Sequence, residues 1–226
     1  MELKITTEKL EKNLGQGFDP KKELTPEEKE IARSLETLPS LDIRAEIDLI
    51  LVWRNLKSAS QLFFPAGTTD ANMVKIKERI EKAGLFFIDD GVILDKMYGN
   101  GLVRLCFIAN NEKDLYLFAE LWFGDHIADS LVYKEIGRMS GFPQSAIDTY
   151  DKFIMLSGKE RDAAKEELTL SENEKKDLFP ADLYRLSLFF YMSRAHWQTE
   201  LETVRTWVEE LKRVTPSLYQ RFIEEL

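Results

Sequence analysis

The chain has 226 residues and carries 40 acidic against 31 basic side chains, for a formal net charge of −9. A negative field of this size repels phosphate backbones, so the composition disfavours nucleic-acid binding. Hydrophobic residues make up 44% and charged residues 31%, proportions typical of a globular protein with a sizeable core. These values exclude a disordered polyelectrolyte, and we expect a folded chain.

The apolar segments are too short for a membrane protein. The longest nearly continuous run, residues 47–53, falls far below the roughly 20 residues that cross a bilayer. The N-terminal sequence MELKITTEKLEKNL lacks a basic segment followed by an apolar one, so no secretory signal is predicted. We therefore expect a cytoplasmic protein. Its one cysteine, Cys106, lies in the strand-like run LVRLCFIA and is expected in the core.

The first helix is predicted by its start signal. Residues 1–24 combine glycines and lysines without a steady apolar period, and we expect a loosely ordered N-terminal arm there. At Thr25 a cap residue precedes Pro26 in the first turn, and Glu28 follows three positions after the cap. This pattern satisfies otherwise unpaired backbone amides. It predicts a helix from Thr25 to about Leu38.

Two more helices are expected before the first strands. Pro39 stops the first helix, and residues 41–63 are apolar on more than one side, which is typical of a buried helix. A third helix is expected at residues 70–83. It ends at Gly84, the residue type that best adopts the left-handed C-terminal cap.

The pattern then changes to one typical of strands. The segments LFFID, GVILD and LVRLCFIAN are rich in branched and aromatic residues. Turn-forming sequences separate them at Asp89-Asp90-Gly91 and Tyr98-Gly99-Asn100-Gly101. We expect two or three antiparallel strands in this region.

The rest of the chain is predicted to be helical. Helices are expected at residues 112–123, 125–139 and 143–156, followed by a charged connection at 158–177 that contains a second capping box at Ser171. The last long helix is expected to begin at Ser193, and Pro216 opens a short final one. Spacings of four and three align one apolar stripe on the long helix. The stripe consists of Trp197, Leu201, Val204, Val208 and Leu211.

These elements predict the fold class. We expect one mainly helical α+β domain over residues 25–226, with a small two- or three-stranded antiparallel sheet and a helical C-terminal layer. The connection at 158–177 is the one credible sub-boundary. The helices after it are too few to bury their apolar surface alone, which favours a single domain.

Common catalytic signatures are absent from the sequence. It contains no GxxxxGK[ST], no GxGxxG after a strand, no HExxH and no CxxC. The usual nucleotide, zinc and redox assignments therefore lose their support, and the sequence assigns no cofactor. Imidazole chemistry is restricted to His126 and His196, the two histidines of the chain.

Each histidine leaves alternative interpretations open. On a helix, Asp129 and Ser130 lie on the same face as His126, so this group could line a binding pocket or only make hydrogen bonds at the edge of the core. His196 lies one turn before Glu200. A metal site of two histidines and one carboxylate could combine His126 and His196 with Asp129 or Glu200. The alternative for His196 is a neutral imidazole packed beside the next tryptophan.

The segment Gly141-Phe142-Pro143 ends one helix and begins the next. Gly141 permits the positive φ of a helix cap, and Pro143 fits a first turn, so a purely structural corner explains both residues. The new helix also leaves its first amides, near Ser145, free to bind an anion. The Ser145 hydroxyl could assist. Both interpretations remain open from the sequence.

A pocket beside this corner is the main site hypothesis. Trp122 stands where aromatic and polar residues adjoin a helix break, although core packing would also explain it. Lys57 would supply a positive charge. The predicted ligand-binding residues are Lys57, Trp122, His126, Asp129, Gly141, Phe142, Pro143 and Ser145.

Three segments resemble a known family. IGRMSGFPQSAIDTYDKF resembles the helix, Gly-Tyr-Pro-x-Cys-Cys, helix segment of an uncharacterised family of archaeal and small-genome bacterial proteins, domain of unknown function family 483. LVWRNLKSASQLF is similar to that family's helix ending in Gly-Leu-Lys-Pro-Ala, and LVRLCFIANNEKDL resembles its strand followed by a helix. The resemblance covers roughly residues 45–153. It implies a shared fold and no particular activity.

The chain departs from the family pattern at several positions. Ser145 and Ala146 stand where the family has paired cysteines, which removes thiolate chemistry from this corner. Asn55 and Ser58 replace the expected glycine and proline. If the family works through its cysteines, this chain does not.

Three functional hypotheses follow from the sequence. The first is a non-catalytic, small-ligand-binding or regulatory protein that holds a small anionic ligand at the corner. The second is a metal-assisted hydrolase or oxygenase that uses His126 and His196. The third is a helical protein-protein interaction module, in which a partner or a second copy binds the apolar stripe of the C-terminal helix.

Overall fold

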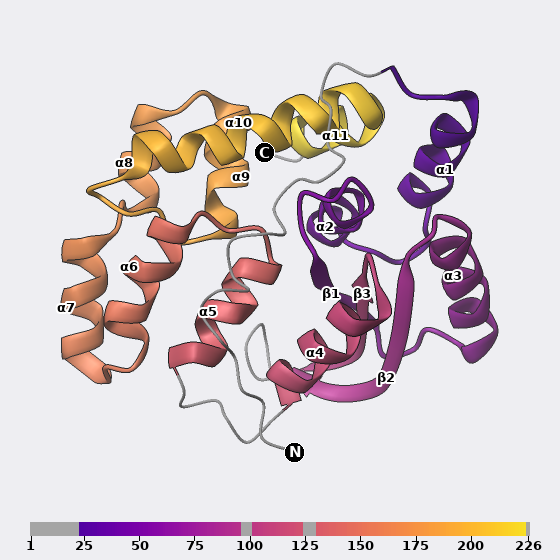
Figure 1. Cartoon of the computed structure of the whole chain (residues 1–226), viewed down its shortest axis with the longest axis horizontal. Helices are drawn as coiled ribbons and strands as arrows, with labels where there is room; N and C mark the ends of the chain where they lie inside the picture. Colours follow the sequence, from indigo (N-terminus) through magenta and orange to yellow (C-terminus); the bar gives the residue numbers. More distant parts are fainter. Residues whose placement is uncertain (1–22, 96–100, 124–129, 225–226) are drawn as a thin grey trace.

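The chain folds as a mainly helical α+β protein with a three-stranded antiparallel sheet. The computed structural model describes residues 23–95, 101–123 and 130–224. We refer to residues 23–95 and 101–123 as the α/β part, and to residues 130–224 as the helical part. Figure 1 shows the α/β part beside the helical part, and α10 crosses the top of the view toward α11.

The first three helices have the predicted positions, with one correction to the second. Thr25 and Glu28 form the expected capping box at the start of α1. The N-cap of α2 is Asp42, whose carboxylate accepts the amide hydrogen of Ala45. Helix α2 ends ten residues before the predicted limit. The bounds are Pro26–Glu36 for α1, Ile43–Trp53 for α2 and Asp70–Lys82 for α3.

Strand β1 replaces the predicted second half of this helix. Asn55 has a φ of +58°, in the left-handed region, and this turns the chain out of the helix. Strand β1 follows at Ala59–Pro65. Ser60, Leu62 and Phe64 are buried on one of its faces, which is the period of a strand. The helix prediction for residues 54–63 was therefore wrong.

The predicted turn at residues 89–91 is a β-bulge. Strand β2 runs without a break over Phe86–Asp95, and its pairing with β3 shifts register between Asp89 and Gly91. Gly91 has a φ of +89°, and its amide donates to the Asp89 carboxylate. The segments LFFID and GVILD thus belong to one strand. Strand β3, Gly101–Ala109, lies in the middle of the order β1-β3-β2.

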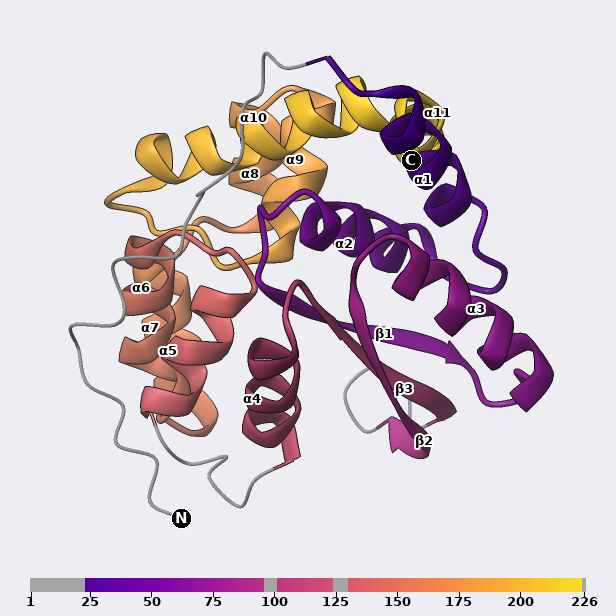
Figure 2. The same ribbon diagram turned by 45° about the vertical axis from the view of Figure 1, so that its right-hand side comes forward.

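The sheet is covered on both faces (Figure 2). On one face, α4 (Glu112–Phe123, as predicted) packs in a core cluster around Phe107 and Phe118, whose rings meet edge to face. On the other face, Cys106 and Ile108 belong to the main core, with α2 and α3. Cys106 is completely buried, as expected for a core residue. Burial also raises the pKa of its thiol, which keeps it in the unreactive form.

The helical part is helical as predicted, and the charged connection predicted at residues 158–177 contains two helices, at residues 158–168 and 172–178. Helix α10 begins four residues later than expected, because Ser193 forms a bridge with Thr169 instead of helical hydrogen bonds. The bounds are Ser130–Met139 for α5, Gln144–Ile154 for α6, Gly158–Leu168 for α7, Glu172–Leu178 for α8, Ala181–Leu186 for α9, Ser187–Phe189 for the 3-10 helix η2, Trp197–Val214 for α10 and Pro216–Glu224 for α11.

The apolar stripe of α10 lies inside the chain. Leu201, Val204, Val208 and Leu211 are buried in the main core, together with Leu62 of the sheet. This core draws on residues from both sides of the connection at 158–177. Self-association through the stripe would therefore require the core to open. Across the described ranges, every helix falls short of the length and apolar character that a membrane span requires.

Candidate functional site

The Gly141 corner packs directly on the segment that follows α2. Gly141 has a φ of +73°, and a side chain there would overlap the carbonyl oxygen of Leu56 and lie 3.1 Å from Lys57 Cγ. The amide of Ser58 donates to the carbonyl of Met139 at 2.8 Å. Two segments more than 80 residues apart in the sequence are therefore in backbone contact, and only glycine fits between them.

A third segment, the end of β3, also meets this contact. Asn110, at the end of the β3 segment, donates from Nδ2 to the Lys57 carbonyl at 2.9 Å and from its amide to the Ser58 carbonyl. Asn55 has a φ of +58°, the left-handed conformation that glycine adopts most easily. We call residues 55–58, Asn110 and residues 139–143 the joint.

Lys57 is the buried charge of the joint. Its side chain is 3% exposed, and Nζ donates to Asp48 Oδ1 at 2.6 Å. The second oxygen of Asp48 accepts a hydrogen bond from the Ser60 hydroxyl. Burial lowers the pKa of Lys57, and the charge of Asp48 opposes this effect. Asp48 keeps 16% of its side chain exposed, so the carboxylate is better hydrated than its partner.

Three aromatic rings surround the Lys57 ammonium. Nζ lies 5.6 Å from the ring centroid of Phe142, 5.2 Å from that of Phe189 and 4.9 Å from that of Trp207. Each distance is within the range of a cation–π interaction. We call Lys57, Asp48 and these three rings the lysine cage.

Ser145 binds a carboxylate of the protein itself. Its hydroxyl donates to Glu200 Oε1 at 2.7 Å, and Glu200 Oε2 accepts the amide hydrogen of Ser193 at 2.7 Å. Glu200 is completely buried. Burial raises the pKa of its carboxyl, and the hydrogen bonds and the charge of Lys175 oppose this. An anionic group thus lies at the start of α6, where the sequence predicted a small anion, but it belongs to α10.

Lys175 holds the chain segment next to this carboxylate. It is buried on α8, and Nζ donates to the carbonyl oxygens of Ser187 (2.8 Å) and Phe190 (3.3 Å). Burial lowers the pKa of Lys175 to about 8, against the opposing charges of Glu172 and Glu200. A neutral amine still donates two hydrogens, so these two bonds survive loss of the proton.

The shifted pKa of Lys175 predicts stability that increases with pH. In the folded chain Lys175 loses its proton near pH 8, whereas its ordinary pKa is 10.5, so the unfolded chain binds more protons between these values. From about pH 8 to about pH 10, Lys175 should add about 2 kcal/mol to the free energy of unfolding. The stabilisation is lost again as pH falls through 8.

Urea unfolding of the wild type and Lys175→Met at both pH values isolates this effect, because other groups titrate equally in the two proteins. Relative to Lys175→Met, the free energy of unfolding of the wild type should be greater at the higher pH than at the lower pH. An unchanged difference would contradict the assignment.

The other predicted pocket residues are not all brought to the joint. Trp122 lies in the core cluster of α4, edge to face with Phe118, and among the described residues its buried Nε1 has no hydrogen-bond partner. His126 and Asp129 lie outside the described residues. Pro143 is the N-cap of α6, and its carbonyl accepts the amides of Ala146 and Ile147. The structure therefore groups Lys57, Gly141, Phe142, Pro143 and Ser145 around the corner.

The proposed metal ligands have other roles where the structure describes them. His196 is exposed and forms the N-cap of α10. Both carboxylate oxygens of Glu200 accept hydrogen bonds from Ser145 and Ser193. In the ranges 23–95, 101–123 and 130–224, no three His, Cys, Asp or Glu residues are grouped as a metal site. A site that includes His126 stays a prediction.

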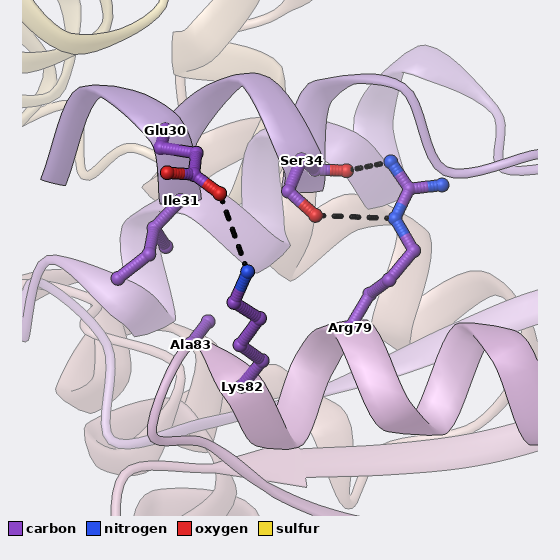
Figure 3. A pocket seen from close by; sticks show the side chains of 6 residues that line it. All are labelled: Glu30, Ile31, Ser34, Arg79, Lys82 and Ala83. Atoms are coloured by element: carbon purple, nitrogen blue, oxygen red, sulfur yellow. Dashed lines mark hydrogen bonds and ion pairs between the residues drawn. The ribbon is translucent and has the colours of Figure 1, made fainter. Parts of the chain in front are cut away.

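A small cavity between α1 and α3 has little room for a ligand. It measures about 60 Å³, well below the roughly 300–1,000 Å³ of sites for small molecules. Figure 3 shows its two cations already paired. Lys82 binds Glu30 at 3.2 Å, and the Arg79 guanidinium binds Ser34 and the Thr37 carbonyl at the C-terminal end of α1. The cavity belongs to a helix–helix contact.

Two important residues were missed by the sequence analysis. Asp48 had a signal, since it is the one charged side chain of the apolar run 47–53. A charge inside a buried helix requires a partner. The partnership of Glu200 with Ser145 spans 55 positions and had no local signal.

Comparisons of the chain with protein-family models, with curated proteins and with solved structures find no match. The resemblance of residues 45–153 to domain of unknown function family 483 stays a prediction.

Proposed function

We propose that the protein is a non-catalytic regulatory protein that binds a small anionic ligand at the start of α6. In the structure, the carboxylate of Glu200 occupies the place that this anion would take. The observation that supports this proposal is the completely buried Glu200 carboxylate, held by the Ser145 hydroxyl and the Ser193 amide.

The surroundings of Glu200 supply hydrogen-bond donors and positive charge to its carboxylate, and these oppose the effect of burial, which raises the pKa of the carboxyl group. A carboxylate loses several kcal/mol of hydration on complete burial, so it is stable only where donors and positive charge replace water. A hydroxyl from α6 and an amide before α10 supply the donors. Electrostatic interactions with Lys175 and His196 favour the charged form of its carboxyl group. A carboxylate or phosphate ligand requires the same groups.

Displacement of Glu200 would change the structure around α10. Glu200 lies in the first turn of this helix, and its carboxylate fixes the amide of Ser193 at the end of the segment 187–193. A ligand that took its place would release the segment from α10. This segment carries Phe189 and Phe190, which pack against Trp207 in the core. Ligand binding would thereby be transmitted to the core around Trp207.

The proposal predicts that removal of the internal carboxylate opens the site to added anions. Acetate and inorganic phosphate should raise the thermal midpoint of Glu200→Ala, because they restore partners for Ser145 and Ser193. The matched control is Glu202→Ala, which removes an exposed carboxylate from the same helix. Its midpoint should respond to the anions only as the wild type does.

A second variant tests the position of the site. Ser145→Leu combined with Glu200→Ala should abolish the extra response to anions, because leucine fills the place of the hydroxyl. An equal response of Glu200→Ala and Glu202→Ala would contradict the proposal. In the wild type, a thermal-shift screen of carboxylates and phosphates should find a stabilising ligand whose effect Ser145→Leu abolishes.

A further inference from the structure

The lysine cage compensates the burial of an ammonium group in an unusual way. An ammonium has three donor hydrogens, and among the described residues Asp48 is the one hydrogen-bond acceptor recorded for Nζ. The rings of Phe142, Phe189 and Trp207 face the remaining sides. Desolvated cation–π contacts of this kind favour a cation over a neutral group of the same size. The cage therefore has the composition of a site for an organic ammonium ion.

The members of the cage come from both parts of the protein. Lys57 and Asp48 belong to the α/β part, on and after α2. The three rings belong to the helical part: Phe142 to the corner before α6, Phe189 to η2 and Trp207 to α10. One ammonium group thus extends from the first part into a cage formed largely by the second.

The charges around the cage define its selectivity. Asp48 is the carboxylate at hydrogen-bond distance, and the guanidinium carbon of Arg44 lies 4.6 Å from the ring centroid of Phe189. Arg44 repels the ammonium and Asp48 attracts it. Glu200 is not a member of the cage, so the cage and the proposed anion site use different side chains, and both contact the segment 187–193.

We infer that the lysine cage is an alkylammonium-binding site that the chain fills with its own Lys57, and that this internal ligand clamps the α/β part to the helical part. The clamp is made of an ion pair on one side and three aromatic faces on the other. It goes beyond the proposed anion-binding function, and each can fail without the other.

Chemical rescue tests the inference. Lys57→Ala removes the atoms from Cγ to Nζ, and propylammonium contains those same atoms. Propylammonium should raise the thermal midpoint of Lys57→Ala and bind about tenfold more tightly than n-propanol, its neutral analogue. It should not raise the thermal midpoint of the wild type or of the control Lys152→Ala, which changes an exposed position on α6. Equal effects of the amine and the alcohol, or no effect of either, would overturn the inference.

A second measurement covers the case in which Lys57→Ala does not fold. Lys57→Met keeps all but the last heavy atom of the side-chain length without the charge, and methionine packs well against rings. Hydrogen exchange should be faster in Lys57→Met than in the wild type at residues 187–193 and 139–143, while Lys152→Met shows no change there. Unchanged exchange in Lys57→Met would show that the ammonium does not clamp the two parts.

Discussion

Replacement of Gly141 by alanine should lower the free energy of unfolding by about 3–5 kcal/mol. Part of the cost comes from the φ of +73°, which an L side chain rarely adopts. The larger part comes from the new Cβ, which would overlap the carbonyl oxygen of Leu56. That oxygen belongs to the backbone of the joint and cannot move aside without breaking the bond from Ser58 to Met139. Urea unfolding of the variant measures the loss.

Substitution of two other glycines separates the cost of the positive φ from the cost of the steric overlap. Gly84 has a φ of +79° and open space around it, so Gly84→Ala should cost only about 1 kcal/mol. Gly67 has neither a positive φ nor a close neighbour, and Gly67→Ala should be nearly neutral. If Gly141→Ala were no more costly than Gly84→Ala, the close contact at the joint would be disproved.

Asp48→Asn should lower the free energy of unfolding by about 3 kcal/mol. The substitution keeps the shape of the side chain but removes the negative charge 2.6 Å from the Lys57 ammonium. With 3% exposure, that ammonium cannot be hydrated in place and must lose its proton or leave the cage. The opposite deletion leaves a carboxylate that is 16% exposed and still hydrogen-bonded to Ser60. Lys57→Met should therefore cost less, about 1–2 kcal/mol.

The double variant Asp48→Asn, Lys57→Met shows the sign of the coupling energy between the two side chains. Because Lys57→Met removes the unpaired cation, the protein with both substitutions should be more stable than Asp48→Asn alone. Urea unfolding of the four proteins supplies the complete cycle. If the two costs simply added, the ion pair would have no coupling energy, and the buried charge would not depend on Asp48.

Local signals predicted most of the helices. The capping boxes at Thr25 and Ser171 are both present, because each depends only on residues three positions apart. Gly84 ends α3 as expected, with a positive φ. Such features are decided within one turn of the chain, so the sequence contains all the information they need.

The errors arose where tertiary structure decides. Residues 59–65 suit a buried helix or a strand equally well, and pairing with β3 selects the strand. The bulge at Gly91 likewise depends on the register with β3. Helix α10 does not begin at Ser193 as predicted, because the backbone of Ser193 bonds to Glu200 and pairs with Thr169. None of these partners is close in the sequence.

The candidate site was predicted in part. Gly141 and Ser145 were identified from helix-end chemistry, which is local. The contact of Gly141 with Leu56, and that of Ser145 with Glu200, join distant segments and could not be inferred from spacing. The sequence predicted that a separate ligand would bind as the anion at α6, whereas in the structure the carboxylate of Glu200 lies there.

The bulge in β2 also affects how molecules meet in solution. Strand β2 is an edge of the sheet, and it exposes Phe86 and Val92, the kind of surface on which another strand can add. Between them the bulge interrupts the ladder and exposes Asp90, while the Asp89 carboxylate is ion-paired with Arg104 of β3. Two copies that approached edge to edge would bring like charges together at a twisted, irregular backbone. The irregularity thereby opposes the pairing of β2 with the same strand of a second copy.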